Sequence, residues 1–183
     1  MTDGKMTFGE VASALDETWA NTSWQAGELR HDGGTYRGTY HVRLADDWDE
    51  RAPHRPLLHG STLYQIAEYH ALVSLIFAYA NRHYPAFDSV PAMTMAEARR
   101  RFLLTSVRLD LHKPIFASEV PVQLRVDRLV NKMQKHRLVF FDGFVSLGDG
   151  EHEARMGGCL NLRDDLIATG DAATDATQGT SAP

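Results

Sequence analysis

Gly60 and Glu68 are the residues whose types and spacing could support chemistry. Gly60 opens a long apolar segment that is expected to be helical, and the first N–H groups of a helix have no partner within it. Such groups favour a developing negative charge, and a glycine lets a ligand carbonyl approach closely. Glu68 follows eight residues later among apolar neighbours. Its carboxylate could activate water or attack an acyl carbon, so the pair predicts an oxyanion donor together with a base or nucleophile.

Each of these two residues also has a purely structural interpretation. Gly60 alone could simply permit a turn before the helix. Glu68 alone could be a core glutamate that is bonded to Tyr64 or to an arginine. At about 100° per residue, however, the polar side chains of the first helical turns share one narrow arc, which we call the polar stripe: Ser61, Tyr64, Gln65 and Glu68.

The distance between Gly60 and Glu68 constrains where a shared site can form. Eight residues at a rise of about 1.5 Å place them roughly 12 Å apart on one helix, too far to act on the same carbon. A site that uses both must therefore combine Gly60 of one subunit with Glu68 of another. Antiparallel central helices across a twofold axis meet this requirement and give two sites per dimer.

Two histidines lie near this segment. His59 precedes the helix and is a candidate catalytic residue that could orient the substrate carbonyl. His70 is about 180° from Ser61 around the helix, so a structural role is favoured for it. The ligands needed for a metal site do not share one face, and no His-Glu-x-x-His motif is present, so we expect no metal and no cofactor.

The segment from His83 to Phe102 is longer than the usual connection of about 4 to 6 residues. It contains apolar side chains next to the end of the central helix, among them Phe87 and Met93. These two residues are expected to bind substrate by lining or covering an acyl tunnel. The alternative is a peripheral helix that only covers the end of the sheet. Basic residues in Arg99–Arg101 and Lys113 could bind the phosphates of coenzyme A or an acidic carrier protein, or could simply be solvated.

Hydrophobic periodicity predicts which elements position these residues. A helix over 7–19 begins with a capping box of Thr7 and Glu10. The central helix, over 61–82, is apolar nearly all round and must be buried on every side. The remaining expected elements are strands at 24–30 and 35–44 joined by a glycine turn, a loop at 45–56, a helix at 94–102, and alternating strands at 107–111, 120–126, 136–147 and 156–162.

Composition excludes several classes of protein. The chain has 183 residues, a formal net charge of -5 and one cysteine, Cys159. It has no extended basic run for nucleic acid, no thiolate cluster and no apolar stretch long enough to span a membrane. The polar N-terminus lacks a secretion signal, so we expect a cytoplasmic protein. We expect one domain over 1–166, and a disordered tail over 167–183 that is rich in Ala, Thr, Gly, Asp and Ser.

A buried helix followed by long antiparallel strands has few packing solutions. A curved antiparallel sheet that wraps around the helix buries most of it, and a second copy of the sheet can cover the rest. The expected fold class is therefore α+β, in the arrangement called the hotdog fold.

The segment from Leu58 to Glu68 resembles the helix-start motif of hotdog-fold acyl-CoA thioesterases. In that motif a His-Gly pair opens the central helix, as His59 and Gly60 do here, and an acidic residue lies eight positions after the glycine. The downstream strands over 107–163 are also similar to that family. The insertion and the Lys113-Pro114-Ile115 junction look more like the FcoT-like branch of long-chain fatty acyl thioesterases.

This resemblance implies hydrolysis of a fatty acyl-CoA or an acyl-carrier-protein thioester, in lipid or natural-product biosynthesis, by a homodimer or a tetramer. Ser61 stands where many of these enzymes have a second glycine, and Glu68 where many have aspartate. Both changes keep a small residue and a carboxylate. Ser61, Tyr64 and His70 are the approximate counterparts of the family's auxiliary polar residues, and so are candidate substrate-binding residues.

Two other functions remain open. The segment from Arg55 to Gly60 also resembles the helix entry of hotdog hydroxyacyl-carrier-protein dehydratases, but Arg51 and Gln65 stand where those enzymes need a catalytic histidine and acid. His54 is the candidate substitute for that histidine. A non-catalytic acyl-binding protein with the same fold is the second alternative, because fold does not determine function.

Overall fold

The computed structural model describes residues 6–16, 23–42, 60–113 and 117–163. The expected loop at 45–56 and the expected tail from 167 lie outside this part of the chain. The elements in chain order are α1 (Phe8–Asp16), β1 (Trp24–Asp32), β2 (Thr35–Val42), α2 (Gly60–Ala80), the 3-10 helix η1 (Pro85–Phe87), α3 (Met95–Arg101), β3 (Phe102–Leu111), β4 (Glu119–Asn131), α4 (Met133–His136), β5 (Leu138–Leu147) and β6 (His152–Asn161).

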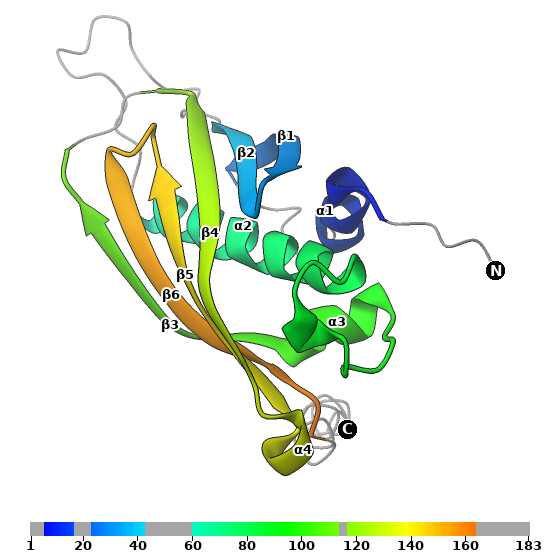
Figure 1. Ribbon diagram of the computed structural model, residues 1–183. Coiled ribbons are helices and arrows are strands. Elements are labelled where there is room, and N and C mark those ends of the chain that lie inside the picture. Colours follow the sequence, from blue (N-terminus) through cyan, green and yellow to red (C-terminus); the bar gives the residue numbers. More distant parts are fainter. Residues whose placement is uncertain (1–5, 17–22, 43–59, 114–116, 164–183) are drawn as a thin grey trace, which may run out of the picture.

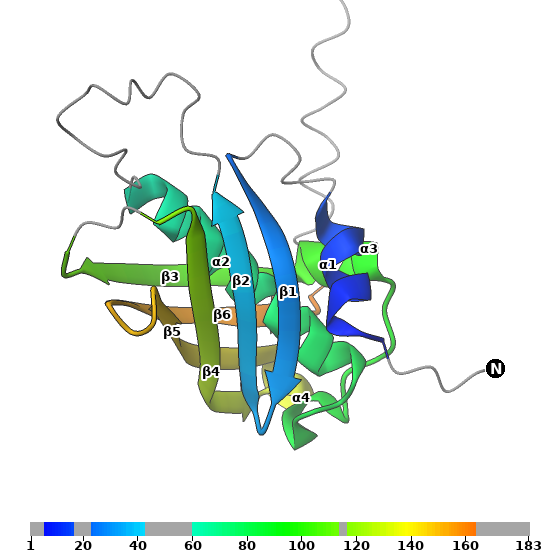
Figure 2. The ribbon, with the colours of Figure 1, turned by 90° about the horizontal axis from the view of Figure 1, so that it is seen from above.

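The described strands form one six-stranded sheet in the order β1-β2-β4-β5-β6-β3, with every neighbouring pair antiparallel. The β1–β2 hairpin turns at Gly33 (φ 55°) and Gly34 (φ 85°), where the positive φ that such a turn requires is available to glycine. Figure 2 shows that the strands at the two ends of the sheet run in clearly different directions. The sheet is therefore strongly twisted and curved, and it has a concave face.

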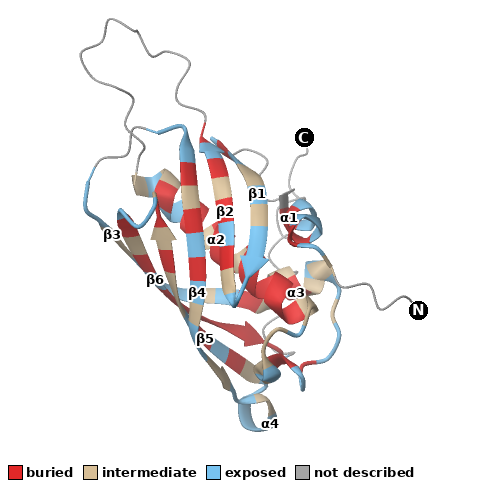
Figure 3. Ribbon diagram, turned by 45° about the horizontal axis from the view of Figure 1, so that its top comes forward, coloured by how far each residue is buried: buried red, intermediate tan, exposed pale blue. Residues whose placement is uncertain are grey.

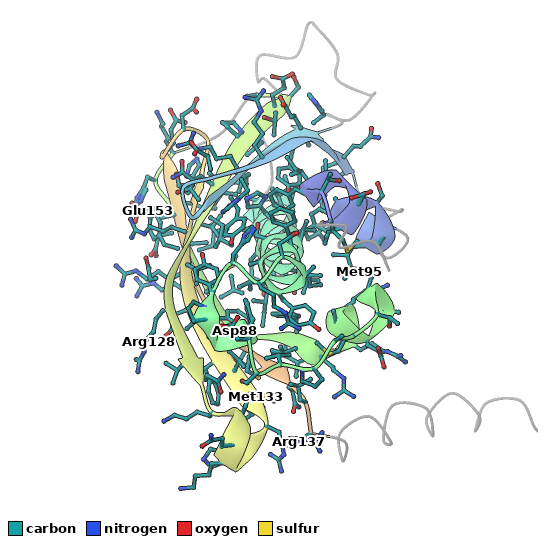
Figure 4. The ribbon with its side chains drawn as sticks, turned by 45° about the vertical axis from the view of Figure 1, so that its right-hand side comes forward. Asp88, Met95, Arg128, Met133, Arg137 and Glu153 are labelled. Atoms are coloured by element: carbon teal, nitrogen blue, oxygen red, sulfur yellow. The ribbon has the colours of Figure 1, made fainter. Side chains whose placement is uncertain are left out.

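Helix α2 occupies this concave face (Figure 1). It packs against β2, β3, β4 and β5, and α1 and α3 cover part of the side that the sheet leaves open (Figure 4). Most of its 21 residues are buried, as the apolar pattern predicted. The expected burial of the central helix is thus confirmed.

Several strands alternate between this core and solvent, whereas β6 is buried continuously from Met156 to Asn161. Figure 3 shows buried residues alternating with more exposed ones along β2 and along the first half of β4. This alternation is what the period of two in the sequence predicted. The described chain therefore has the curved antiparallel sheet around a central helix that defines the hotdog fold.

Helices α1 and α3 both begin with a capping box. In α1 the backbone N–H of Thr7 donates to Glu10 Oε2 at 2.6 Å, and the N–H of Glu10 donates to Thr7 Oγ1 at 3.2 Å. The cap predicted from the sequence is confirmed. Thr94 and Glu97 form the same pair of bonds at the start of α3.

Several strands are longer than the alternation predicted. β3 begins at Phe102 rather than at 107, β4 continues to Asn131, and β6 begins at His152 rather than at 156. The pattern in β6 is interrupted by Gly157 and Gly158, which carry no side chain. A Cβ at Gly158 would collide with the carbonyl oxygen of Leu103 and the ring of Phe141, so close packing between strands explains the glycine there.

Candidate active site

Gly60 is the first residue of α2 and is half-buried. An added Cβ at this position would lie 3.0 Å from Leu111 Cδ1, at the end of β3. The start of the helix is thus packed close to the end of an edge strand. The Gly60 N–H is among the first donors of a long helix, which have no partner within the helix itself. It is therefore available in principle to a ligand carbonyl.

The polar stripe defined above is the part of α2 that the rest of the described chain leaves uncovered. Ser61, Tyr64 and Gln65 are exposed, and Tyr64 retains 40% of its accessible surface. Glu68 at the end of the stripe is half-buried. The stripe predicted from helical geometry is confirmed as a surface of the single chain.

Glu68 has no partner among the described residues. None of them donates a hydrogen bond to its carboxylate or forms an ion pair with it, so the expected alternative of a bond to Tyr64 or an arginine gains no support there. Burial raises the pKa of the Glu68 carboxyl above its ordinary value. A half-buried carboxylate without a compensating partner is suited to accept a proton from a bound water.

Gly60 and Glu68 stand on one uninterrupted helix, since α2 runs from Gly60 to Ala80. Their separation along the axis is therefore about 12 Å. A single chain does not bring the two residues together.

The structure places His70 in the core, away from the polar stripe. It is fully buried, its Nδ1 lies 2.8 Å from the Tyr40 hydroxyl, and its Nε2 lies 3.0 Å from the carbonyl oxygen of Tyr36. Both ring nitrogens are thus used to join α2 to β2, which is the structural role favoured from the sequence. His59, the other candidate histidine, lies outside the described residues.

The two apolar candidates of the insertion differ in their surroundings. Phe87 is fully buried and its ring contacts those of Tyr79, Tyr84 and Phe102. Met93 is half-buried and packs against the edge of the same core. Phe87 is therefore a packing residue in this chain, and Met93 is the more accessible of the two.

The basic candidates lie at two different ends of α2. The cluster Arg99–Arg101 ends α3, which packs near the C-terminal half of α2, and Arg101 donates to the carbonyl oxygen of Asn161 at 3.3 Å. Lys113 follows β3 near Gly60 and forms an ion pair with Glu151. Of these residues, only Lys113 belongs to the strand end whose Leu111 contacts Gly60.

Two surface depressions, of about 570 and 700 Å³, lie on the outer face of the sheet. The first is lined by residues such as Arg37 and Gln123, and the second by residues such as Phe144 and Arg155. None of the candidate site residues lines either depression. In the described part of the chain, no group of three His, Cys, Asp or Glu side chains is arranged to hold a metal ion, and no helix is long and apolar enough to cross a membrane.

Sequence analysis did not single out His152, which the structure buries completely at the start of β6. It pairs across the ladder with Leu111, the residue that lies against Gly60. Extending the alternation of Met156 backward through Ala154 would have assigned His152 to the buried face. The glycines that follow Met156 concealed this longer strand.

Comparisons with known proteins agree with the fold. The chain is similar to a putative thioesterase from Syntrophus aciditrophicus, with a TM-score of 0.54 and 14% identity over 83% of this chain and 97% of that one. It is also similar to a thioesterase from Haemophilus influenzae, with a TM-score of 0.53 and 8% identity over 88% of this chain and 95% of that one. A mutant thioesterase from Pseudomonas aeruginosa gives a TM-score of 0.51 and 14% identity over 87% of this chain and 98% of that one. No protein-family model and no curated protein sequence matches the chain. At such low identity the similarity concerns architecture, and the described chain has the hotdog fold of these thioesterases.

Proposed function

We propose that this protein hydrolyses acyl thioesters at sites shared between two copies of the chain. The observation that carries the proposal is Glu68, a half-buried carboxylate with no partner among the described residues, eight positions after the glycine that begins the same helix. The architecture shared with several thioesterases supports the same reaction class.

In the proposed reaction, water attacks the thioester carbon and the carbonyl oxygen becomes an oxyanion. The Gly60 N–H and the positive end of the α2 dipole stabilise this charge. Glu68 removes the proton from the attacking water as a general base, and the collapse of the intermediate expels the thiolate. An alternative route has Glu68 attack the carbon directly to form an anhydride, which water then hydrolyses. His59 is retained as a candidate that orients the carbonyl.

The single chain supports sharing of the site in two ways. The polar stripe is uncovered, and the neighbouring strand β3 is an edge of the sheet. Toward its C-terminal end β3 keeps apolar residues that are partly exposed, with Leu111 at 48%. A second copy packed antiparallel along α2 would cover these residues and bring its Glu68 to the first copy's Gly60. Ser61 and Tyr64 would then line the shared site.

The proposed substrate is a fatty acyl thioester of coenzyme A or of an acyl carrier protein, as in the FcoT-like branch. Lys113 lies two residues after Leu111, which contacts Gly60, and would be a candidate to approach the thiol carrier. Its ion pair with Glu151 limits how far it can serve as a free phosphate ligand. We place this chemistry in the cytoplasm, in lipid or natural-product biosynthesis.

Purified protein incubated with a panel of acyl-CoA and acyl-carrier-protein thioesters tests the proposal. We expect release of free thiol, measured with a thiol-reactive dye. Formation of the trans-2-enoyl product from 3-hydroxyacyl thioesters would instead indicate a dehydratase. Saturable binding without thiol release would indicate an acyl-binding protein. Either of these results in the absence of hydrolysis contradicts the thioesterase proposal.

A further inference from the structure

His152 is a fully buried histidine on the face of the sheet that α2 covers. Its ladder neighbours Leu111 and Leu147 share this face, and Leu147 is itself fully buried. The next residue in β6, Glu153, points away from α2 on the outer face (Figure 4). Since side chains alternate along a strand, the imidazole of His152 lies on the inner side.

The hydrogen bonding of His152 determines where its proton resides. Nδ1 lies 3.2 Å from the backbone nitrogen of His112, whose N–H donates to it. A ring nitrogen that accepts a hydrogen bond carries no proton, so the neutral ring carries its proton on Nε2. Burial lowers the pKa of His152, against an opposing effect of the nearby Glu151 carboxylate. The ring is therefore neutral at neutral pH, with an N–H donor at Nε2.

This Nε2–H donor is buried and has no hydrogen-bond partner in the part of the chain that the structure describes. Among the described residues its ladder neighbours offer only aliphatic side chains, those of Leu111 and Leu147. A buried donor without an acceptor is unfavourable, because the donor has lost its bond to water and gained nothing in return. An acceptor supplied by a ligand would remove this penalty.

The position of His152 connects it to the start of α2. Leu111 lies directly opposite His152 in the β3–β6 ladder and approaches the Cβ position of Gly60 to 3.0 Å. The ion pair of Lys113 with Glu151 joins the same two strand ends. The unpartnered donor therefore lies at the end of the fold where the helix presents its own first N–H groups.

We propose that His152 Nε2–H donates a hydrogen bond to an oxygen of the acyl thioester bound at the start of α2, which makes His152 a substrate-binding residue. This inference rests on the proposed thioesterase function. Two oxygens share the required chemistry, the thioester carbonyl itself and an oxygen carried by the acyl chain near it. In a shared site, the His152 donor and Gly60 come from one subunit and Glu68 comes from the other. His152 therefore acts on the same side of the substrate as Gly60.

Two amide substitutions distinguish a hydrogen bond from His152 to the substrate from a purely structural role of His152. The amide oxygen of His152→Asn can replace Nδ1 and accept the N–H of His112, but this side chain has no donor at the position of Nε2. The longer His152→Gln places an amide N–H near Nε2 and gives up the bond to His112. Unfolding temperature and circular dichroism establish that both variants fold.

We expect His152→Asn to lower kcat/KM by roughly 5- to 150-fold, the loss of one hydrogen bond to a buried group, while His152→Gln stays within a few-fold of the wild type. The reverse order would show that His152 only holds the strand end through His112, and would overturn the proposal. Equal activity of both variants and the wild type would overturn it as well.

Plain acyl-CoA and 3-oxoacyl-CoA of equal chain length distinguish the two oxygens. Equal losses in His152→Asn on both substrates identify the thioester carbonyl as the acceptor. A loss confined to the 3-oxoacyl substrate identifies the oxygen of the acyl chain, since a site built to bond a polar group discriminates strongly against analogues that lack it.

Failure of the proposed hydrolysis is distinguishable from failure of this inference. If the wild type releases no thiol from any substrate of the panel, binding of a non-hydrolysable ketone analogue of acyl-CoA is measured by calorimetry. Tight binding that weakens in His152→Asn but not in His152→Gln supports the hydrogen bond without catalysis. Absence of binding to the wild type, or equal binding by all three proteins, overturns it.

Discussion

His70 Nδ1 lies 2.8 Å from the hydroxyl oxygen of Tyr40 inside the core, so one hydrogen bond joins the central helix to β2. The other ring nitrogen donates to the carbonyl oxygen of Tyr36 on the same strand. Burial lowers the pKa of His70 to about 4. The polar stripe of α2 is therefore anchored to the sheet by a neutral imidazole, and a proton added at Nδ1 would end its role as acceptor of the Tyr40 hydroxyl.

The pH dependence of stability follows from this buried imidazole. Because its pKa in the folded protein lies below the ordinary value of 6.5, the unfolded chain binds the proton more readily between pH 6.5 and 4. This part of the stability is present above pH 6.5 and is lost as the pH falls, by roughly 3 kcal/mol at pH 4. Urea unfolding of the wild type and His70→Gln at pH 7 and 4.5 measures it. A variant that loses as much stability on acidification as the wild type would show that His70 is not the responsible group.

Replacement of the proposed base tests the chemistry most directly. Glu68→Gln removes the carboxylate and keeps its shape, so we expect an intact fold and a turnover lower by about 10² to 10⁴. Glu119→Gln is a matched control, since Glu119 is an exposed carboxylate on β4. The acid limb of the wild-type pH profile should fall at a pH above the ordinary pKa of glutamate, because burial raises the pKa of Glu68 and only the ionised form acts. Near-normal turnover in Glu68→Gln would favour a core glutamate.

Sharing of the site between subunits predicts complementation. Gly60→Val places a side chain against Leu111 and Glu68→Gln removes the base, so each variant alone should be inactive. Random mixing gives heterodimers in half of the molecules, each with one intact site, and we expect roughly a quarter of the wild-type activity. Native mass spectrometry verifies that heterodimers have formed. No recovery in a verified mixture would place the whole site within one chain.

The same geometry predicts which residue lies at the twofold axis, where it faces the identical residue of the partner subunit. If Gly60 of one helix lies opposite Glu68 of the other, the twofold axis passes beside the residue midway between them, Tyr64, which is 40% exposed. We expect Tyr64→Cys to form an intersubunit disulfide under mild oxidation, on non-reducing gels. Ser61→Cys is the control, because three residues from the axis its copies are about 9 Å apart along the helices, beyond disulfide reach. Cross-linking of Ser61→Cys without Tyr64→Cys would require a different helix register.

The sequence determined some parts of this molecule well because the relevant forces are local. Alternation identified the strands, and the uniform apolar character of α2 identified the buried helix. The polar stripe followed from helical geometry alone. The extent of β6 did not follow, since Gly157 and Gly158 are selected by contact with β3 and β5 rather than by their own chain neighbours.

The parts of the site that the sequence could not provide depend on contacts across the sheet. His152 becomes noticeable only when β6 is placed beside β3, where Leu111 connects it to Gly60. In the same way, the sequence shows only that Phe87 is apolar, and an apolar residue can either line a tunnel or fill a core. Its three aromatic neighbours show that it fills a core in the single chain.

This difference between Phe87 and Met93 changes how the proposed acyl tunnel should be tested. Phe87→Ala is expected to cost about 3 to 5 kcal/mol of stability, because the side chain is fully buried, so its effect on substrate preference would be hard to interpret. Met93 is half-buried and flexible, and is the better position.

If Met93 lines the tunnel, Met93→Ala should shift the preference in kcat/KM toward longer acyl chains and Met93→Phe toward shorter ones, with activity on short thioesters unchanged. The reason is that only a long chain reaches a side chain next to the C-terminal end of α2, more than two helical turns beyond Glu68. Met133→Ala is the control, since Met133 is also half-buried but lies on α4, outside the segment from His83 to Phe102 (Figure 4). The measurement is kcat/KM across saturated acyl-CoA substrates of increasing length. An unchanged profile in stable Met93 variants would mean that the segment from His83 to Phe102 serves only to cover the core.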